Sequence, residues 1–139
     1  MSKNPSDILL LLVDDDLSIR KLIKTICMSF GIKKIIEAAD GRDAVQLLKN
    51  PPASRPGESL SKRKFDCIVS DWMMPDMTGI ELLRHVRKDP KYIETPFILL
   101  TAERDQDNVR QAIEAGCDDY IIKPFTSDDL EKKLRRLLF

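Results

Sequence analysis

Short apolar runs alternate along the chain with segments whose apolar positions recur every three or four residues. Continuous apolar runs predict strands that are covered on both faces, and the three-to-four spacing predicts amphipathic helices. The expected strands are at residues 8–13, 34–38, 65–70, 97–100 and 120–122. The expected helices follow them in turn, at residues 19–30, 41–49, 79–86, 109–116 and 130–138.

This fivefold alternation predicts an α/β fold with a doubly wound parallel sheet, because parallel neighbours need crossover connections that place helices on both faces. Right-handed crossovers leave few topologies. The length of 139 residues and the hydrophobic content of 42% fit one domain with a single core. In such sheets, ligands bind outside the carboxyl ends of the strands, where the strand order reverses.

Residues 50–64 interrupt the alternation with the sequence NPPASRPGESLSKRK. The segment is rich in proline, serine and charge and has no apolar periodicity, so we expect an extended surface loop on the edge opposite the carboxyl ends of the strands. Both a mobile solvated insertion and a basic docking patch fit this composition. A nucleic-acid site is not indicated, because the only adjacent aromatic is Phe65, which we assign to a strand.

The 23 acidic and 23 basic residues balance, so no global field points to nucleic acid or to an anionic membrane. Cys27, Cys67 and Cys117 form no CxxC pair and are expected to be small buried side chains in a reducing compartment. The single histidine, His85, excludes a multi-histidine metal site. No apolar run is long enough for a signal peptide or a membrane span, and we expect a cytoplasmic protein.

Polar residues stand where the predicted strands end. They are Asp14, Asp15 and Asp16 after the first strand, Asp71 after the third, Thr101 after the fourth and Lys123 after the fifth. If the first and third strands are neighbours, carboxylates crowd around Asp71, and their repulsion requires either protonation or a cation. Carboxylate oxygens without a nearby histidine or thiolate suit Mg²⁺.

Lys123 adds a fixed positive charge beside these acids, and Thr101 adds a hydroxyl donor. An anion-binding pocket next to a carboxylate is suited to phosphoryl transfer. Asp71 could then act as the nucleophile and form an acyl phosphate. The competing interpretation is helix capping, which is common for aspartate at a strand end. It applies best to Asp16 and, taken alone, also to Asp14 and Asp15.

Four motifs resemble those of the response-regulator receiver domains of two-component signalling: VDDD with Arg20 following, SDWMMPDMTG, LLTAE and DDYIIKPF. The resemblance covers about residues 8–138, and Trp72 directly after the aspartate is most similar to the stand-alone chemotaxis regulators. It implies the flavodoxin-like (βα)5 fold with strand order 2-1-3-4-5. It also implies one receiver domain over residues 1–139.

The resemblance further implies a phosphorylation-activated regulator rather than a metabolic enzyme, one that promotes its own phosphorylation and dephosphorylation. The donor would be a phosphohistidine on a sensor kinase or a histidine phosphotransfer protein. The output would be altered binding of a downstream protein to the surface formed by the fourth helix, fifth strand and fifth helix, without direct nucleic-acid contact or membrane insertion. The implied residues are Asp71 as phosphoacceptor; Asp14, Asp15, Asp71 and the Met73 backbone carbonyl as Mg²⁺ ligands; Lys123 as partner of the phosphoryl oxygens; Thr101 and Tyr120 as switch residues; and a cis Lys123–Pro124 bond.

One departure from the chemotaxis pattern is Met73, where those regulators carry asparagine. With Glu103, this position flanks the path of water to the phosphoryl group, so we expect slow dephosphorylation. Three alternatives remain open: a Mg²⁺-dependent phosphohydrolase with an aspartyl nucleophile, an unphosphorylated interaction module, and a receiver fragment of a longer regulator. The phosphohydrolase class expects a second acid at the position of Met73.

Overall fold

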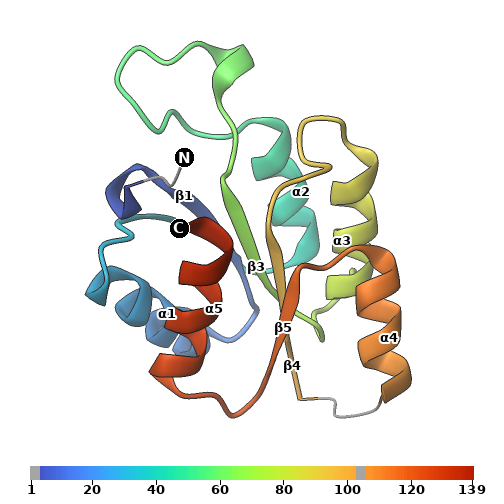
Figure 1. The fold of residues 1–139 in the computed structure, drawn as a ribbon. Coiled ribbons are helices and arrows are strands. Elements are labelled where there is room, and N and C mark those ends of the chain that lie inside the picture. The colour runs from blue at the N-terminus through green and yellow to red at the C-terminus, as the bar shows by residue number, and fades with distance from the viewer. Residues whose placement is uncertain (1–3, 103–105) are drawn as a thin grey trace.

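The computed structural model describes residues 4–102 and 106–139 and contains a five-stranded parallel sheet. The strand order is β2-β1-β3-β4-β5, which confirms both the predicted fold class and the order implied by the resemblance (Figure 1). The strands are β1 (Leu9–Val13), β2 (Lys34–Ala38), β3 (Cys67–Asp71), β4 (Phe97–Thr101) and β5 (Asp119–Ile122).

Helices cover both faces of the sheet (Figure 1). Helices α1 and α5 pack together on one face, while α2, α3 and α4 line the other. Their bounds are α1 (Leu17–Ser29), α2 (Gly41–Lys49), α3 (Gly79–Lys88), α4 (Gln106–Ala115) and α5 (Ser127–Leu138), with short 3-10 turns η1 (Pro5–Asp7) and η2 (Leu60–Lys62). Within the described residues, none of these helices combines the length and hydrophobicity that a bilayer crossing requires.

Side chains at helix starts explain where several helices begin. Asp16 and Asp40 accept hydrogen bonds from the first-turn amides of α1 and α2, which confirms the capping interpretation for Asp16. Thr78 and Thr126 form capping boxes at α3 and α5. The capping box at Thr126 starts α5 three residues before the predicted residue 130, since its polar first turn carries no apolar signal.

The third strand is shifted from its predicted position. Phe65 is buried but lies outside β3, which instead ends with Asp71 inside the strand. Asp71 pairs with Leu100 of β4, and the Trp72 amide continues this pairing by donating to the Leu100 carbonyl. Backbone pairing extends the strand to the aspartate, a contribution that the apolar pattern cannot reveal.

The apolar core has two halves, one on each side of the sheet, because successive strand residues point to opposite faces. Leu10, Leu12 and Leu100 pack on the side of α1 and α5. Leu11 and Leu99 pack on the side of α2, α3 and α4. This alternation decides on which side of the sheet each residue at a strand end lies.

The cysteines are free, and Cys27 and Cys67 are buried as predicted. Cys117 is only half-buried, so the prediction of a buried side chain is wrong for this thiol. Burial raises the pKa of Cys27 to about 12 and that of Cys117 to about 11. We therefore expect all of them to remain protonated near neutral pH.

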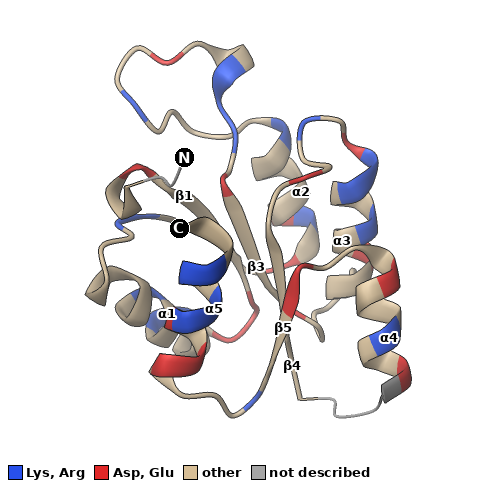
Figure 2. Ribbon diagram, viewed as in Figure 1, with Lys and Arg blue, Asp and Glu red and all other residues tan. Residues whose placement is uncertain are grey.

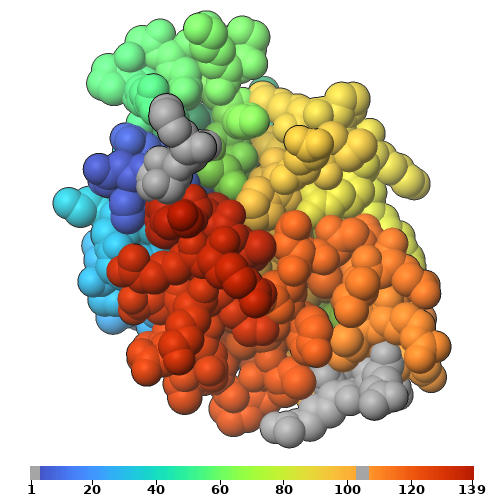
Figure 3. Space-filling model, viewed as in Figure 1, coloured from blue at the N-terminus to red at the C-terminus, as the bar shows by residue number. Residues whose placement is uncertain are grey.

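Residues 50–64 project beyond the end of the sheet opposite the carboxyl ends of the strands, as predicted (Figures 1 and 3). The insertion has internal order: the Ser54 amide donates to Glu58, Arg63 donates to the Glu58 carbonyl, and Lys34 of β2 donates to the Ser54 carbonyl. Three consecutive basic residues, Lys62, Arg63 and Lys64, lie near its end, where the ribbon is blue (Figure 2). Whether it docks a partner stays a prediction.

Candidate functional site

Three polar side chains continue the strand positions that face α1 and α5. Leu12 precedes Asp14 by two residues, Val69 precedes Asp71, and Ile121 precedes Lys123, with all three apolar residues in the same core half. Residues two apart in a strand share a face. Since Val13 pairs with Ser70, Asp14 and Asp71 emerge side by side at the carboxyl edge of the sheet.

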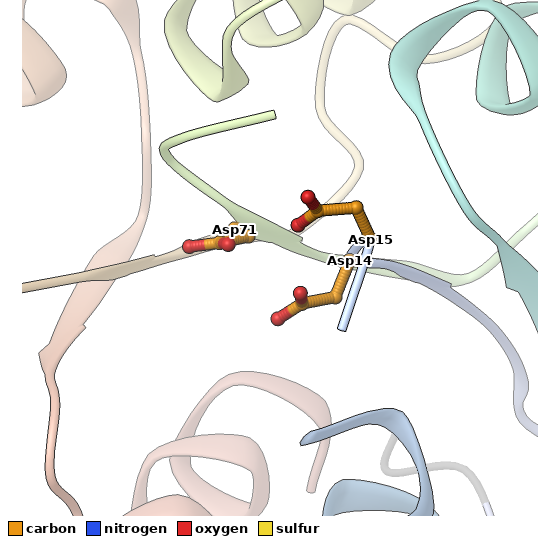
Figure 4. A group of neighbouring side chains, drawn as sticks. All are labelled: Asp14, Asp15 and Asp71. Carbon is orange, nitrogen blue, oxygen red and sulfur yellow. The ribbon is translucent and has the colours of Figure 1, made fainter. Parts of the chain in front are cut away.

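The predicted acidic cluster is present in the structure. One carboxylate oxygen each from Asp14, Asp15 and Asp71 lies within 4.8 Å of the others. The three side chains come from the end of β1 and the end of β3, and their carboxylates extend to the same side (Figure 4). Such closely spaced negative charges repel one another unless a cation or a proton intervenes.

Asp14 is fully buried, so its negative charge is removed from water. Its Oδ1 accepts a hydrogen bond from the Asp16 amide at 2.9 Å, but its Oδ2 has no hydrogen-bond donor among the described residues. Burial, with smaller contributions from the charges of Asp71 and Asp15, raises the pKa of Asp14 to about 6. The Asp16 amide and Lys123 oppose this rise. A buried acceptor without a donor is the feature that a bound cation would satisfy.

Lys123 supplies the positive charge that the sequence predicts beside the acids. Its Nζ lies 3.1 Å from Asp71 Oδ1 and 3.5 Å from Asp14 Oδ2. The backbone amide of Lys123 donates to the Thr101 carbonyl at 2.7 Å, which aligns the end of β5 with that of β4. The Lys123–Pro124 bond is cis, as the resemblance implies.

The two carboxylate oxygens of Asp71 differ in their hydrogen bonds. Its Oδ1 accepts hydrogen bonds from the Trp72 amide at 2.9 Å and from Lys123 Nζ at 3.1 Å. No described residue donates to its Oδ2. The carboxylate is therefore fixed in orientation by one oxygen while the other is available for chemistry.

Thr101 and Tyr120 belong to the neighbouring strands β4 and β5, on the face of the sheet opposite the acidic cluster. Thr101 is buried at the end of β4 and continues the positions of Phe97 and Leu99, which face α2, α3 and α4. Half-buried Tyr120 packs against the same core half, and its ring centroid is 5.4 Å from Lys133 Nζ. Both residues thus lie on the face of the sheet that α4 covers, and their switch roles stay predictions.

Two other residues, Met73 and Glu103, were predicted to flank the path of water to the phosphoryl group. The Met73 side chain follows β3 and is 68% exposed, so it packs against little of the protein. The role of its backbone carbonyl as a Mg²⁺ ligand stays a prediction. Glu103 lies outside the described residues.

Gly79 allows α3 to begin directly against the backbone of Asp71. A Cβ atom at Gly79 would lie 2.3 Å from the Asp71 carbonyl oxygen and 3.0 Å from Trp72 Cα, both backbone atoms. The Gly79 amide also donates to the Trp72 carbonyl at 2.8 Å. The end of β3 and the start of α3 are therefore in contact with no room for a side chain.

We expect Gly79→Ala to lower the free energy of unfolding by about 1–3 kcal/mol, because backbone must move to admit the methyl group. Gly41→Ala is the comparison: Gly41 also begins a helix, but the nearest atoms to its Cβ would be those of the Met77 side chain, with Met77 Cβ at 2.6 Å, rather than backbone, so we expect a smaller loss. Urea unfolding of both variants measures the difference. Equal losses in the two variants would contradict this explanation.

Two charged residues that support the site, Arg20 and Glu37, were not predicted from the sequence. Arg20 was noted only as part of a motif, yet its Nη1 donates to the Asp14 carbonyl at 2.6 Å. Its Nε donates to Glu37 Oε1 at 3.1 Å. The available signal was a single glutamate near the end of a β2 strand that is otherwise apolar after Lys34.

Known proteins with similar sequences point to one family. The family model of the response regulator receiver domain matches residues 10–135. The chemotaxis protein CheY of Pseudomonas aeruginosa is 36% identical over 128 residues, which cover 92% of this chain and 94% of the relative. The match thus includes the segments that carry the acidic cluster, Thr101, Tyr120 and Lys123.

Solved structures lead to the same conclusion. The chemotaxis response regulator CheY4 of Vibrio cholerae has a TM-score of 0.78 at 33% identity, covering 94% of this chain and 98% of its own. The receiver domain of a sensor histidine kinase of P. aeruginosa, solved with a magnesium ion coordinated in its active site cleft, has a TM-score of 0.77 at 27% identity over 94% and 97%. Since sequence and structure agree over most of its length, the chain belongs to the response regulator receiver domain family.

Proposed function

We propose that this receiver accepts a phosphoryl group on Asp71 from a phosphohistidine of a sensor kinase or histidine phosphotransfer protein. The observation that carries this proposal is the state of the Asp71 carboxylate, with Oδ1 held by Trp72 and Lys123 and Oδ2 without a described donor. The acceptor oxygen is thus oriented beside a fixed ammonium group that can attract the incoming anion.

We infer that the cofactor is Mg²⁺, held by Asp14, Asp15, Asp71 and the Met73 backbone carbonyl. The clustered carboxylate oxygens fit a hard divalent ion, and the buried Asp14 Oδ2 has no hydrogen-bond donor among the described residues. When bound, Mg²⁺ would neutralise charge on the carboxylates and on the transferred group.

In the transfer itself, Asp71 Oδ2 attacks the phosphorus atom of the donor. An oxygen–phosphorus bond forms while the nitrogen–phosphorus bond breaks, and its electron pair returns to the donor imidazole, which takes up a proton from water. Lys123 Nζ, already 3.1 Å from Oδ1, lies close enough to pair with the phosphoryl oxygens that arrive beside it. The product is an acyl phosphate with a charge of about −1.5 to −2 in place of −1.

The added negative charge makes the phosphorylated and unphosphorylated states interact differently with neighbouring residues, as a switch requires. Lys123 ends β5 and contacts Asp71, and Thr101 ends β4 on the side of α4. Movement of both toward the phosphoryl group would shift α4 and Tyr120 and change the surface of α4, β5 and α5, which faces the viewer in Figure 3. A differential interaction of about 1–3 kcal/mol suffices to alter the affinity for a downstream protein severalfold.

Incubation with phosphoramidate and Mg²⁺ tests the proposal. Intact-mass spectrometry should show one acid-stable, base-labile phosphoryl group on the protein, and a chelator should prevent its appearance. Multiple turnover on a simple phosphomonoester, without accumulation of the modified protein, would instead support the phosphohydrolase alternative. Retention of the unmodified mass under all conditions would contradict a phosphoacceptor.

We further propose that residues 1–139 act as one receiver domain in the cytoplasm, with the insertion at residues 50–64 as part of it. The range that the family model matches, residues 10–135, includes the insertion. The insertion lies at the end of the sheet away from Asp71, so its chemistry is separate from phosphoryl transfer (Figure 1).

Replacement of Met73 by asparagine should speed the loss of the phosphoryl group. The exposed thioether cannot orient an attacking water, whereas an amide can donate and accept hydrogen bonds. After removal of the phosphodonor, we expect the phosphorylated Met73→Asn protein to decay severalfold faster than the parent, about three- to tenfold. Met73→Leu, which keeps the side chain apolar, is the control and should decay like the parent. Equal rates for all three proteins would exclude the effect.

A further inference from the structure

Arg20 joins the turn that carries the acidic residues to the neighbouring strand. It lies in the first turn of α1, and its guanidinium reaches back to the Asp14 carbonyl at 2.6 Å. The same guanidinium is anchored on Glu37 of β2 through Nε, at 3.1 Å. The Arg20 side chain is only 15% exposed, so these two contacts are largely shielded from water.

The Asp14 carbonyl belongs to the peptide unit that leads into Asp15. Because a peptide unit is planar, holding this oxygen also fixes the direction in which the chain reaches Asp15 Cα. The Asp14 side chain is held separately by the Asp16 amide, and the Asp14 amide donates to Ala38. Asp15 is exposed and its side chain makes no hydrogen bond to a described residue, so only its backbone positions it.

Lys24 provides a comparison within the same cluster of charges. Its Nζ lies 3.3 Å from Glu37 Oε2, one helical turn beyond Arg20, but it makes no hydrogen bond to Asp14. Burial opposes ionisation of Glu37, yet the hydrogen bonds from Arg20 and Lys24 lower its pKa below the ordinary value. Glu37 is thus an ionised anchor shared by two cations, only one of which touches the acidic turn.

We propose that Arg20, anchored on Glu37, is a positioning residue for the metal site, which holds the Asp14–Asp15 peptide so that the Asp15 carboxylate stays within reach of the ion. This inference rests on the proposed Mg²⁺ site. Residues that orient metal ligands from outside commonly alter metal affinity by 10- to 100-fold when replaced.

The direction in which Mg²⁺ affinity changes when Arg20 is replaced distinguishes a positioning role from a purely electrostatic one. Removal of a positive charge near a cation site should tighten Mg²⁺ binding if only Coulomb interactions matter. Loss of positioning should weaken it. We expect Arg20→Gln to weaken Mg²⁺ binding about tenfold, and Lys24→Gln, which removes the same charge from the same anchor, to leave it unchanged or slightly tighter.

Mg²⁺ titrations of the full chain followed by the fluorescence of Trp72 measure this affinity, since the single tryptophan directly follows Asp71 and its amide bonds to that carboxylate. Thermal unfolding of each variant without Mg²⁺ reports any general loss of stability. Arg20→Lys keeps the positive charge but lacks the second nitrogen that lets Arg20 contact the Asp14 carbonyl and Glu37 together, so it should show an intermediate loss of affinity that Coulomb interactions alone do not predict. It also serves if Arg20→Gln fails to fold.

Equal Mg²⁺ affinities for the parent and a folded Arg20→Gln protein, or tighter binding by the variant, would overturn the inference. So would matching losses of affinity in the Arg20 and Lys24 variants, which would assign the effect to Glu37 alone. Absence of any Mg²⁺ response in the parent, confirmed by calorimetry, would overturn the metal assignment itself and this inference with it. The results thus distinguish failure of the site from failure of the Arg20 role.

Discussion

Asp71→Asn should take up no phosphoryl group from phosphoramidate under conditions that fully modify the parent protein. The amide removes the nucleophilic oxygen, so we expect the rate of modification to fall by at least about a hundredfold. The fold should persist, because the backbone pairing of Asp71 with β4 does not depend on its side chain. Intact-mass spectrometry over time measures the rate, and circular dichroism checks the fold.

Asp76→Asn is the matched control for this variant. It makes the same chemical change five residues further along, at an exposed position with a φ angle of 67°. Asparagine tolerates this left-handed conformation as well as aspartate does, so no strain is added. The control should be modified at the parental rate. Modification of the Asp71→Asn protein at a similar rate would place the acceptor elsewhere.

Asp14→Asn should have two large effects of opposite sign. Without Mg²⁺, we expect the variant to be more stable than the parent at neutral pH, because it removes a fully buried negative charge beside Asp71. With Mg²⁺ present, the parent should gain stability from binding, whereas the variant should gain little because it has lost an anionic ligand. Urea unfolding with and without Mg²⁺ measures both effects.

The sign of the pH dependence follows from the raised pKa of Asp14. Its ordinary value of 3.8 applies to the unfolded chain, while burial raises the pKa to about 6 in the folded protein. Between these values the folded state binds more protons, so the parent loses stability as the pH rises from 3.8 to about 6. The gain in the free energy of unfolding from Asp14→Asn should therefore be absent below pH 3.8 and complete above about pH 6. A shift of this size corresponds to at most about 3 kcal/mol.

Asp16→Asn controls for the change of charge in the same turn. Asp16 is exposed and caps α1, and asparagine caps a helix about as well as aspartate. We expect its stability to stay within about 0.5 kcal/mol of the parent at every pH. Equal stabilisation by both substitutions, or a constant effect of Asp14→Asn across the pH range, would show that burial of Asp14 is not the cause.

The succession of strands and helices along the chain could be predicted from apolar spacing, because this spacing records which faces are buried, whereas the strand order in the sheet was implied only by the family resemblance. The acids at the ends of β1 and β3 were also predictable, since parallel strands carry their ends to one edge of the sheet. Element ends were less predictable. The start of α5 depends on the polar capping box at Thr126, and the end of β3 depends on backbone pairing at Asp71.

By itself, the sequence determined the layered α/β fold and placed Asp14, Asp71 and Lys123 at strand ends on one edge of the sheet, because both follow from periodicity along single elements. Only the tertiary structure decided which contacts hold the site in place. Arg20 meets Glu37 across two elements, and Gly79 lies against the Asp71 backbone. Such contacts depend on side-chain reach and on the spacing between packed elements, which no local pattern of apolar and polar residues encodes.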